Sequence, residues 1–235
     1  MAVRQSSLAV TWLAIATLFL AGCSGNEGEQ RAAFTGFLQS RVLDKPGVHV
    51  PHLTDDERDR FGAYADDYAV IADFNKAMDE SVSPKMTAAV RAGSITSIED
   101  AVTQRARLET ARTGMSEMGS ALTTALAKAD AAHAKLDQPA DVKAVYDKAY
   151  DRLVTQPAAA FKEIVPVMDT VLGEAIDLGK YLDEHRSSVQ LSGSMIQTND
   201  PAIQAAVNEK LQSLQAKQQA VRSAQVRLQA VAFGN

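Results

Sequence analysis

Histidine and carboxylate side chains crowd one short segment of the chain, and their types are those of metal ligands. The group consists of His49, His52, Asp55, Asp56 and Glu57. Imidazoles and carboxylates bind divalent metals, but Thr54 and Glu57 also have the spacing of a helix-capping box, and acidic residues favour a helix start. We therefore predict a helix start without a metal, and a metal site remains the alternative.

A second group with possible chemistry contains His133. It lies on the apolar stripe of a predicted long helix, three residues after Asp130, and residues at that spacing can hydrogen-bond. An Asp-His pair could serve as a general base. No serine or cysteine nucleophile motif accompanies it, so we favour a half-buried structural histidine and keep catalysis as the alternative.

Two pairs of tyrosines have the spacing of neighbours on one helix face. Tyr64 and Tyr68, with Asp67 between them, could line a pocket, and Tyr146 and Tyr150 repeat the spacing. Aromatic residues at that spacing more often face the core. We predict that both pairs are core residues.

No motif in the sequence specifies a reaction. Phosphate loops, dinucleotide fingerprints, zinc-finger spacings and the Gly-x-Ser-x-Gly nucleophile elbow are absent from the sequence. We therefore expect a protein that is not an enzyme, with no catalytic, cofactor-binding or metal-binding residues and no cofactor.

The only cysteine of the chain, Cys23, lies where an export signal ends. Arg4 supplies a positive start, and an uncharged apolar run follows up to Leu20-Ala21-Gly22-Cys23. This run is shorter than the roughly 20 residues that a transmembrane helix needs. The last four residues resemble the bacterial lipobox, so we predict cleavage before Cys23 and lipid attachment to its thiol, with acyl chains such as palmitate.

The prediction of a lipid anchor divides the chain into three parts. Residues 1–22 are a signal peptide that is removed, residues 23–28 a lipidated tether, and residues 29–235 a single helical domain. Several acyl chains hold a protein firmly in a membrane. Ser24, where sorting in enterobacteria uses Asp to retain a lipoprotein in the inner membrane, points to the outer membrane and a domain facing the periplasm.

The charge of the predicted mature chain is mildly acidic. Removal of Arg4 with the signal leaves 23 basic and 29 acidic residues, a net charge of −6. Nucleic-acid binding would require clustered basic charge, and anionic lipid would require a polybasic patch. We expect no nucleic-acid partner, and we assign membrane binding to the lipid on Cys23.

Forty alanines and few aromatic residues favour helix throughout the chain. Apolar spacing predicts the following segments: a helix over 27–43, a helix from Thr54 with one apolar face up to Met78, a break at Ser83-Pro84, a piece ending at Gly93, a long helix over 97–136 capped by Thr96 and Glu99, a short helix after Pro139, a separate helix from Pro157 to about His185, a hairpin or loop over 189–197, and a last helix from Asp200.

Helices joined by short turns pack as antiparallel neighbours. The sequence therefore predicts an all-α, elongated bundle of about six or seven helices, with one small β-hairpin as an option near 189–197. The Gln-rich last helix, over 212–229, either closes this bundle or docks on a partner helix.

Several strings in the mature part resemble a known family. They are Glu27-Gly28-Glu29-Gln30-Arg31, Ala33-Phe34, Phe37-Leu38-Gln39, Leu53-Thr54, Phe61-Gly62, Asp67-Tyr68-Ala69 and Ala129-Asp130-Ala131-Ala132-His133. Together they resemble the YiaF-like family of proteobacterial lipoproteins, a domain of unknown function. The resemblance implies a helical envelope lipoprotein and transfers no catalytic residue.

These observations favour one function and leave a second open. We expect a lipid-anchored cell-envelope protein whose helical bundle binds or scaffolds an envelope protein partner. The alternative is a small-molecule or lipid-binding lipoprotein with a pocket between helices, around Tyr64, Tyr68 and His133.

Overall fold

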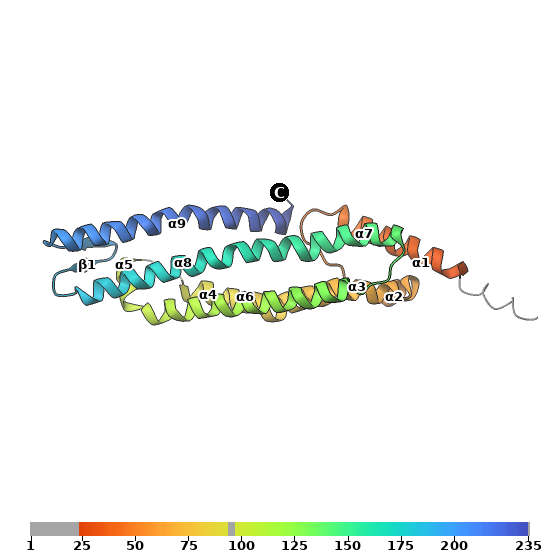
Figure 1. Ribbon diagram of the computed structural model, residues 1–235, viewed down its shortest axis with the longest axis horizontal. Coiled ribbons are helices and arrows are strands. Elements are labelled where there is room, and N and C mark those ends of the chain that lie inside the picture. Colours follow the sequence, from red (N-terminus) through yellow and green to blue (C-terminus); the bar gives the residue numbers. More distant parts are fainter. Residues whose placement is uncertain (1–23, 94–96, 235) are drawn as a thin grey trace, which may run out of the picture.

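The protein is a long, narrow bundle of helices with a small β-hairpin at one end (Figure 1). The computed structural model describes residues 24–93 and 97–234. Within these ranges the chain forms seven continuous helical stretches and one two-stranded antiparallel sheet. The predicted elongated all-α bundle and its hairpin are confirmed.

Three helical stretches make up the N-terminal part of the chain. Their segments are α1 (Ser24–Phe37) with η1 (Leu38–Leu43), α2 (Asp55–Phe61), and α3 (Tyr64–Ala77) with η2 (Met78–Val82) and α4 (Ser83–Gly93). The segments η1, η2 and η3 are π-helical turns within or at the end of a helix.

The remaining four helical stretches and the hairpin follow. They are α5 (Ile98–Thr103), α6 (Arg105–His133), α7 (Ala140–Tyr150) with η3 (Asp151–Thr155) and α8 (Gln156–Glu184), the strands β1 (Gln190–Ser192) and β2 (Met195–Gln197), and α9 (Pro201–Phe233). Asp200 caps α9 through bonds from the amides of Ala202 and Ile203, as its position before proline predicts.

Two predicted helix breaks at prolines were wrong. The helix continues through Ser83-Pro84 and through Pro157, and each of these prolines lies two residues after a π-helical turn, η2 or η3. Proline lacks an amide hydrogen and clashes with the preceding turn of an α-helix. A widened π turn is one of the ways in which a helix accommodates such a defect.

Two other predicted helices are divided. The helix that starts at the Thr54 capping box ends at Phe61, because Gly62 adopts φ +56°, and α3 starts at Tyr64. The predicted helix over 97–136 is interrupted at Gln104 and ends at His133. Apolar periodicity continues across such one-residue interruptions, so it could not reveal them.

The cap of that divided helix also differs from the prediction. Ser97 and Asp100 form the capping box of α5, while Thr96 lies outside the described residues. Both pairs have the same spacing in the sequence, so only the structure distinguishes them.

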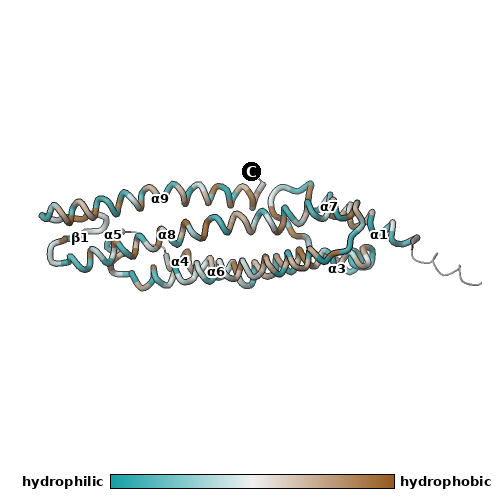
Figure 2. The backbone as a smooth tube through the Cα atoms, viewed as in Figure 1, coloured by the Kyte–Doolittle hydropathy of each residue, from teal (hydrophilic) through white to brown (hydrophobic). Residues whose placement is uncertain are grey.

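The long helices pack side by side along the rod. Helix α8 lies between α9 on one side and α6 on the other, and α4 packs on α6. Hydrophilic and hydrophobic residues alternate along each long helix (Figure 2), as amphipathic packing requires. The main core contains buried residues from every helix between α1 and α8 except α5. A smaller cluster at the hairpin end consists of Leu178, Leu182, Val189, Ile203 and Val207.

The close approach of α5 to α8 depends on a glycine. A Cβ atom at Gly179 would overlap the backbone carbonyl of Ala101, so only glycine fits at this crossing. This contact fixes α5 against the C-terminal half of α8.

Candidate functional site

The predicted lipid-attachment residue, Cys23, lies outside the described residues. Helix α1 begins directly after it, at Ser24, and this helix start lies at one end of the rod (Figure 1). No helix within residues 24–93 and 97–234 is long and apolar enough to cross a bilayer. Because Cys23 is not among the described residues, lipid attachment to it stays a prediction from the sequence.

The histidine and carboxylate group of residues 49–57 is arranged around a helix start. Glu57 receives a bond from the backbone amide of Thr54 at 2.9 Å, and its own amide donates to the Thr54 hydroxyl, which completes the capping box. His49 and His52 are exposed. In the described part of the chain, no three histidine, cysteine or acidic side chains are grouped as a metal site would need.

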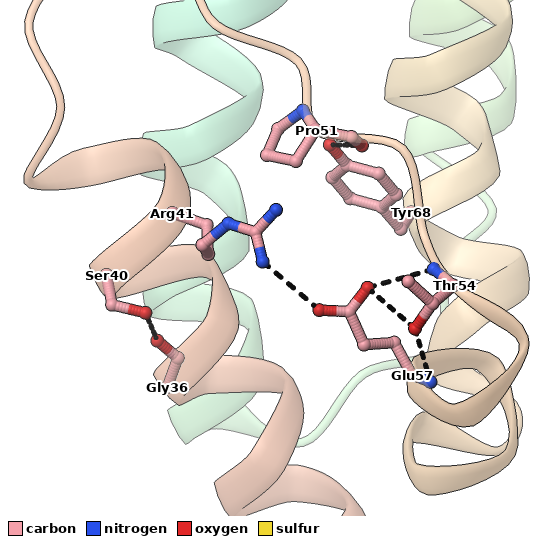
Figure 3. A network of polar contacts seen from close by, with 7 residues as sticks. All are labelled: Gly36, Ser40, Arg41, Pro51, Thr54, Glu57 and Tyr68. Atoms are coloured by element: carbon pink, nitrogen blue, oxygen red, sulfur yellow. Dashed lines mark hydrogen bonds and ion pairs between the residues drawn. The ribbon is translucent and has the colours of Figure 1, made fainter.

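The loop between η1 and α2 is held by side chains from three elements (Figure 3). Arg41 contacts the Glu57 carboxylate at 3.3 Å, and Tyr68 donates to the carbonyl of Pro51 at 2.8 Å. Burial raises the pKa of Tyr68 above its ordinary value. The tyrosine hydroxyl is therefore a neutral structural donor.

A cleft of about 460 Å³ opens beside this loop, within the size range of small-molecule sites. Its floor is apolar, and its rim carries charges of both signs. The floor contains Val50, Pro51, Leu53, Ala65, Tyr68, Ala69 and Ala72, and the rim His52, Arg58, Asp73, Asn75, Lys76, Asp79 and Glu80. Of the residues proposed for a pocket, Tyr68 lines this cleft, and Tyr64 and His133 do not.

An aromatic cluster fills the bundle behind this cleft. Phe34 stacks on Tyr64 with ring centroids 5.6 Å apart, and the Phe37 and Tyr68 rings meet edge to face at 5.3 Å. Tyr64 and Tyr68 are both buried. The predicted core role of this pair is confirmed.

His133 is the last residue of α6 and contacts α7, where it lies beside a carboxylate that the sequence did not suggest. Its Nε2 atom is 2.9 Å from Oδ1 of Asp147, to which Lys143 also donates. The pair with Asp130, which the sequence offered only as a possibility, is not formed; that carboxylate accepts a bond from the Tyr150 hydroxyl at 2.7 Å. These partners come from different helices, so spacing within one helix could not identify them.

The surroundings of His133 are those of a structural residue. Its ring stacks on Tyr150 at 4.0 Å, and its side chain is 22% exposed. Partial burial of the Asp147 carboxylate acts to raise its pKa, but hydrogen bonds from Lys143 and His133 outweigh this effect and lower the pKa of Asp147. His133 lies beside a second titratable group, but not in the cleft described above.

The tyrosines of α7 lie in the core, as predicted. Tyr146 donates to the backbone carbonyl of Asp67 at 2.7 Å, and Tyr150 donates to Asp130. Burial raises the pKa of both tyrosines. Their hydroxyls join α7 to α3 and α6, which explains how large polar aromatics are tolerated in the core.

Sequence reasoning missed Arg152, which lies in η3. It connects the loop after η1 to the helix formed by α7, η3 and α8. Its guanidinium donates to the carbonyls of Leu43 at 2.6 Å and Gly47 at 3.2 Å, and also to that of Lys45. Leu43 is the last residue of η1, and Lys45 and Gly47 follow it, so these carbonyls lie where backbone acceptors lack helical partners. Nothing in the local sequence marks this arginine.

A match to a known family covers most of the chain. The family model described as "Protein of unknown function (DUF3053)" matches residues 10–229. The chain belongs to the DUF3053 family. It is 32% identical over 209 residues to the "Uncharacterized protein YiaF" of Escherichia coli strain K12, and equally similar to those of E. coli O157:H7 and Shigella flexneri.

In each of these comparisons the aligned part covers 87% of this chain and 87% of the relative. The predicted relationship to a YiaF-like family of unknown function is therefore confirmed. No solved structure matches the chain.

Proposed function

We propose that the protein is a lipid-anchored envelope protein that holds a helical binding or scaffolding module in the periplasm. One observation carries this proposal: the start of α1, next to Cys23, lies at the end of the rod opposite the hairpin (Figure 1). The helix formed by α7, η3 and α8 spans residues 140–184. At ~1.5 Å per residue it extends about 68 Å, so an anchor at Cys23 would let the rod reach far from the membrane.

The sequence at the cleavage site supports the anchor. Leu20-Ala21-Gly22-Cys23 has the residues of a lipobox, and the thiol of Cys23 has no other cysteine with which to form a disulfide. Several acyl chains would make the attachment permanent.

The anchor is tested by labelling in an enterobacterial host fed an alkyne analogue of palmitate. The full chain should take up the label and sediment with membranes, and Cys23→Ala should lose at least nine-tenths of the label. Ser24→Ala is the control for a substitution beside the cleavage site and should keep the label. Equal labelling of Cys23→Ala and the parent chain would refute the anchor.

Outer-membrane placement has a separate test. Ser24→Asp should move the protein from the outer-membrane to the inner-membrane fraction of a sucrose gradient, because this position carries the sorting signal. Ser24→Thr should stay with the outer membrane. If Ser24→Asp and the parent chain are both recovered in the inner membrane, the proposed placement is wrong.

The cleft beside Tyr68 favours a second candidate function, the binding of a small molecule. Its apolar floor and charged rim suit an amphiphilic ligand with polar groups at its edge. Native mass spectrometry of the mildly extracted protein should then show added mass, and Ala69→Trp, which fills the floor, should remove it. An unliganded mass for the parent chain would refute this candidate.

A further inference from the structure

Of the three long helices, α9 buries the smallest share of its residues. It buries three of 33, namely Ile203, Val207 and Ala224, whereas α6 buries six of 29 and α8 nine of 29. It lies at the edge of the rod and packs mainly on α8 (Figure 1). The free energy of opening a segment depends on the buried contacts that it makes. Helix α9 should therefore open more readily than α6 or α8.

A carboxylate of α8 lies beneath the middle of α9. Glu163 pairs with Arg227 at 2.7 Å, and the ring centre of Tyr181 is 5.6 Å from the Lys210 ammonium. Glu174 lies 11 residues after Glu163 and seven before Tyr181, which places it on the same face of α8. Its Oε2 atom is buried and has no hydrogen-bond partner among the described residues. Such an acceptor disfavours the closed contact, because opening would return it to water.

The C-terminal end of α9 is fastened to the loop after η1. The amide of Val48 donates to the carbonyl of Ala232 at 3.1 Å. Gly47 and Gly234 have φ values of +69° and +73°. A Cβ atom on Gly47 would overlap the Ala232 carbonyl, and one on Gly234 would overlap the Gly47 amide nitrogen, so only glycine fits at both positions. We call this contact of Gly47, Val48, Ala232 and Gly234 the latch.

The latch joins α9 to a part of the bundle that is held independently of α9. The loop that carries Gly47 and Val48 is fixed by Arg152, which donates to the carbonyls of Leu43 and Gly47. At its other end, α9 contributes Ile203 and Val207 to the cluster at the hairpin end. Helix α9 is thus held firmly at its two ends and weakly between them.

We infer that α9 is a strap, which opens from α8 when the latch is released. The hairpin end acts as its hinge, and the rest of the bundle stays folded. In the closed state the strap covers the face of α8 that carries Glu163, Glu174 and Tyr181. In the proposed binding module, opening would make this face accessible, so the latch would control binding. The opening itself does not depend on the lipid anchor.

The strap is tested by the rate at which a maleimide labels a cysteine beneath it in the full chain. The thiol of Ala224→Cys lies on the buried face of α9, and that of Ala111→Cys lies in the core on α6. Gly234→Ala, which cannot keep the latch, should raise labelling at position 224 at least tenfold and change it at position 111 by less than twofold. No rise at position 224 would overturn the inference. An equal rise at both positions would also overturn it, because the whole bundle would then have opened.

Two controls isolate the latch from other effects. Gly193→Ala introduces a side chain at φ +61° with nothing within 4 Å of the added Cβ, so it matches the backbone strain of Gly234→Ala without touching the latch. It should leave labelling at position 224 within twofold of the parent rate, and a tenfold rise would refute the role of the latch. The parent chain has Cys23 alone, so its own labelling gives the background and reports separately on the anchor.

Hydrogen exchange distinguishes opening from local unwinding of α9. In Gly234→Ala, the amides of residues 208–230 should exchange at least tenfold faster, whereas those of α8 should change by less than twofold, because α6 still covers α8. A short bismaleimide joining Glu163→Cys to Arg227→Cys, in place of their ion pair, should restore the parent exchange rates. Fast exchange that persists in the cross-linked chain would mean that α9 unwinds in place, which would refute the strap.

Discussion

At the residue scale, the side chains with the most evident chemistry in the sequence have structural roles in the described part of the chain. The Tyr68 hydroxyl donates to the loop before α2, and the Tyr150 hydroxyl donates to α6. His133 connects α6 to α7 through Asp147. Sequence spacing predicted which aromatics are buried. It could not predict the partners, because these come from other helices.

Arg152 provides a test of one such role. Arg152→Met should lower the free energy of unfolding by about 2 kcal/mol, because hydrogen bonds from its charged guanidinium to the carbonyls of Leu43, Lys45 and Gly47 are lost. Arg60→Met, at an exposed position, should change it by less than about 0.5 kcal/mol. Urea unfolding measures both, and equal effects would contradict this role of Arg152.

The pair of His133 and Asp147 predicts a dependence of stability on pH. The pKa of Asp147 is lowered in the folded protein from its ordinary value of 3.8. The folded state thus binds this proton less tightly than the unfolded chain, so the stabilisation is complete above about pH 4 and is lost as the pH falls through the lower folded-state pKa.

Asp147→Asn should therefore lose less stability than the parent chain between pH 5 and pH 3, as measured by thermal unfolding. Because Asp147 is 43% exposed, solvent screening keeps the difference small. Asp79→Asn, an exposed change on another helix, should retain the parent dependence. Identical curves for Asp147→Asn and the parent chain would rule out this contribution.

At the element scale, the sequence predicted the helices better than their boundaries. The hairpin around Gly193 and the cap at Asp200 follow local signals. The two continuous helices through Pro84 and Pro157 could not be predicted, because a π turn before proline has no compositional mark. The interruption at Gln104 leaves the apolar period intact.

Gly179 tests the packing of α5 on α8. Gly179→Ala should destabilise the protein by about 2 kcal/mol, because the added methyl group overlaps the carbonyl of Ala101. Gly36→Ala is a matched control in an exposed helical position with open space around it, and it should stabilise by about 0.5–1 kcal/mol through helix propensity. Thermal unfolding that shows stabilisation by both changes would contradict the close crossing.

At the scale of the whole molecule, the bundle is a rod whose two ends differ. One end carries the start of α1, and the other carries the hairpin and α5 (Figure 1). The elongated shape was predictable, since long amphipathic segments with short connections form long antiparallel bundles. The position of α9 at the edge, packed mainly on α8, was not, because its apolar stripe fits either a central or an edge helix.

We propose that Cys23 joins this rod to a membrane. The most direct measurement is the intact mass of the protein extracted from membranes, followed by fragmentation of its N-terminal peptide. We expect a chain that begins at Cys23, lacks residues 1–22, and carries a diacylglyceryl group on the thiol. A chain that retains residues 1–22, or one with an unmodified Cys23 thiol, would contradict it.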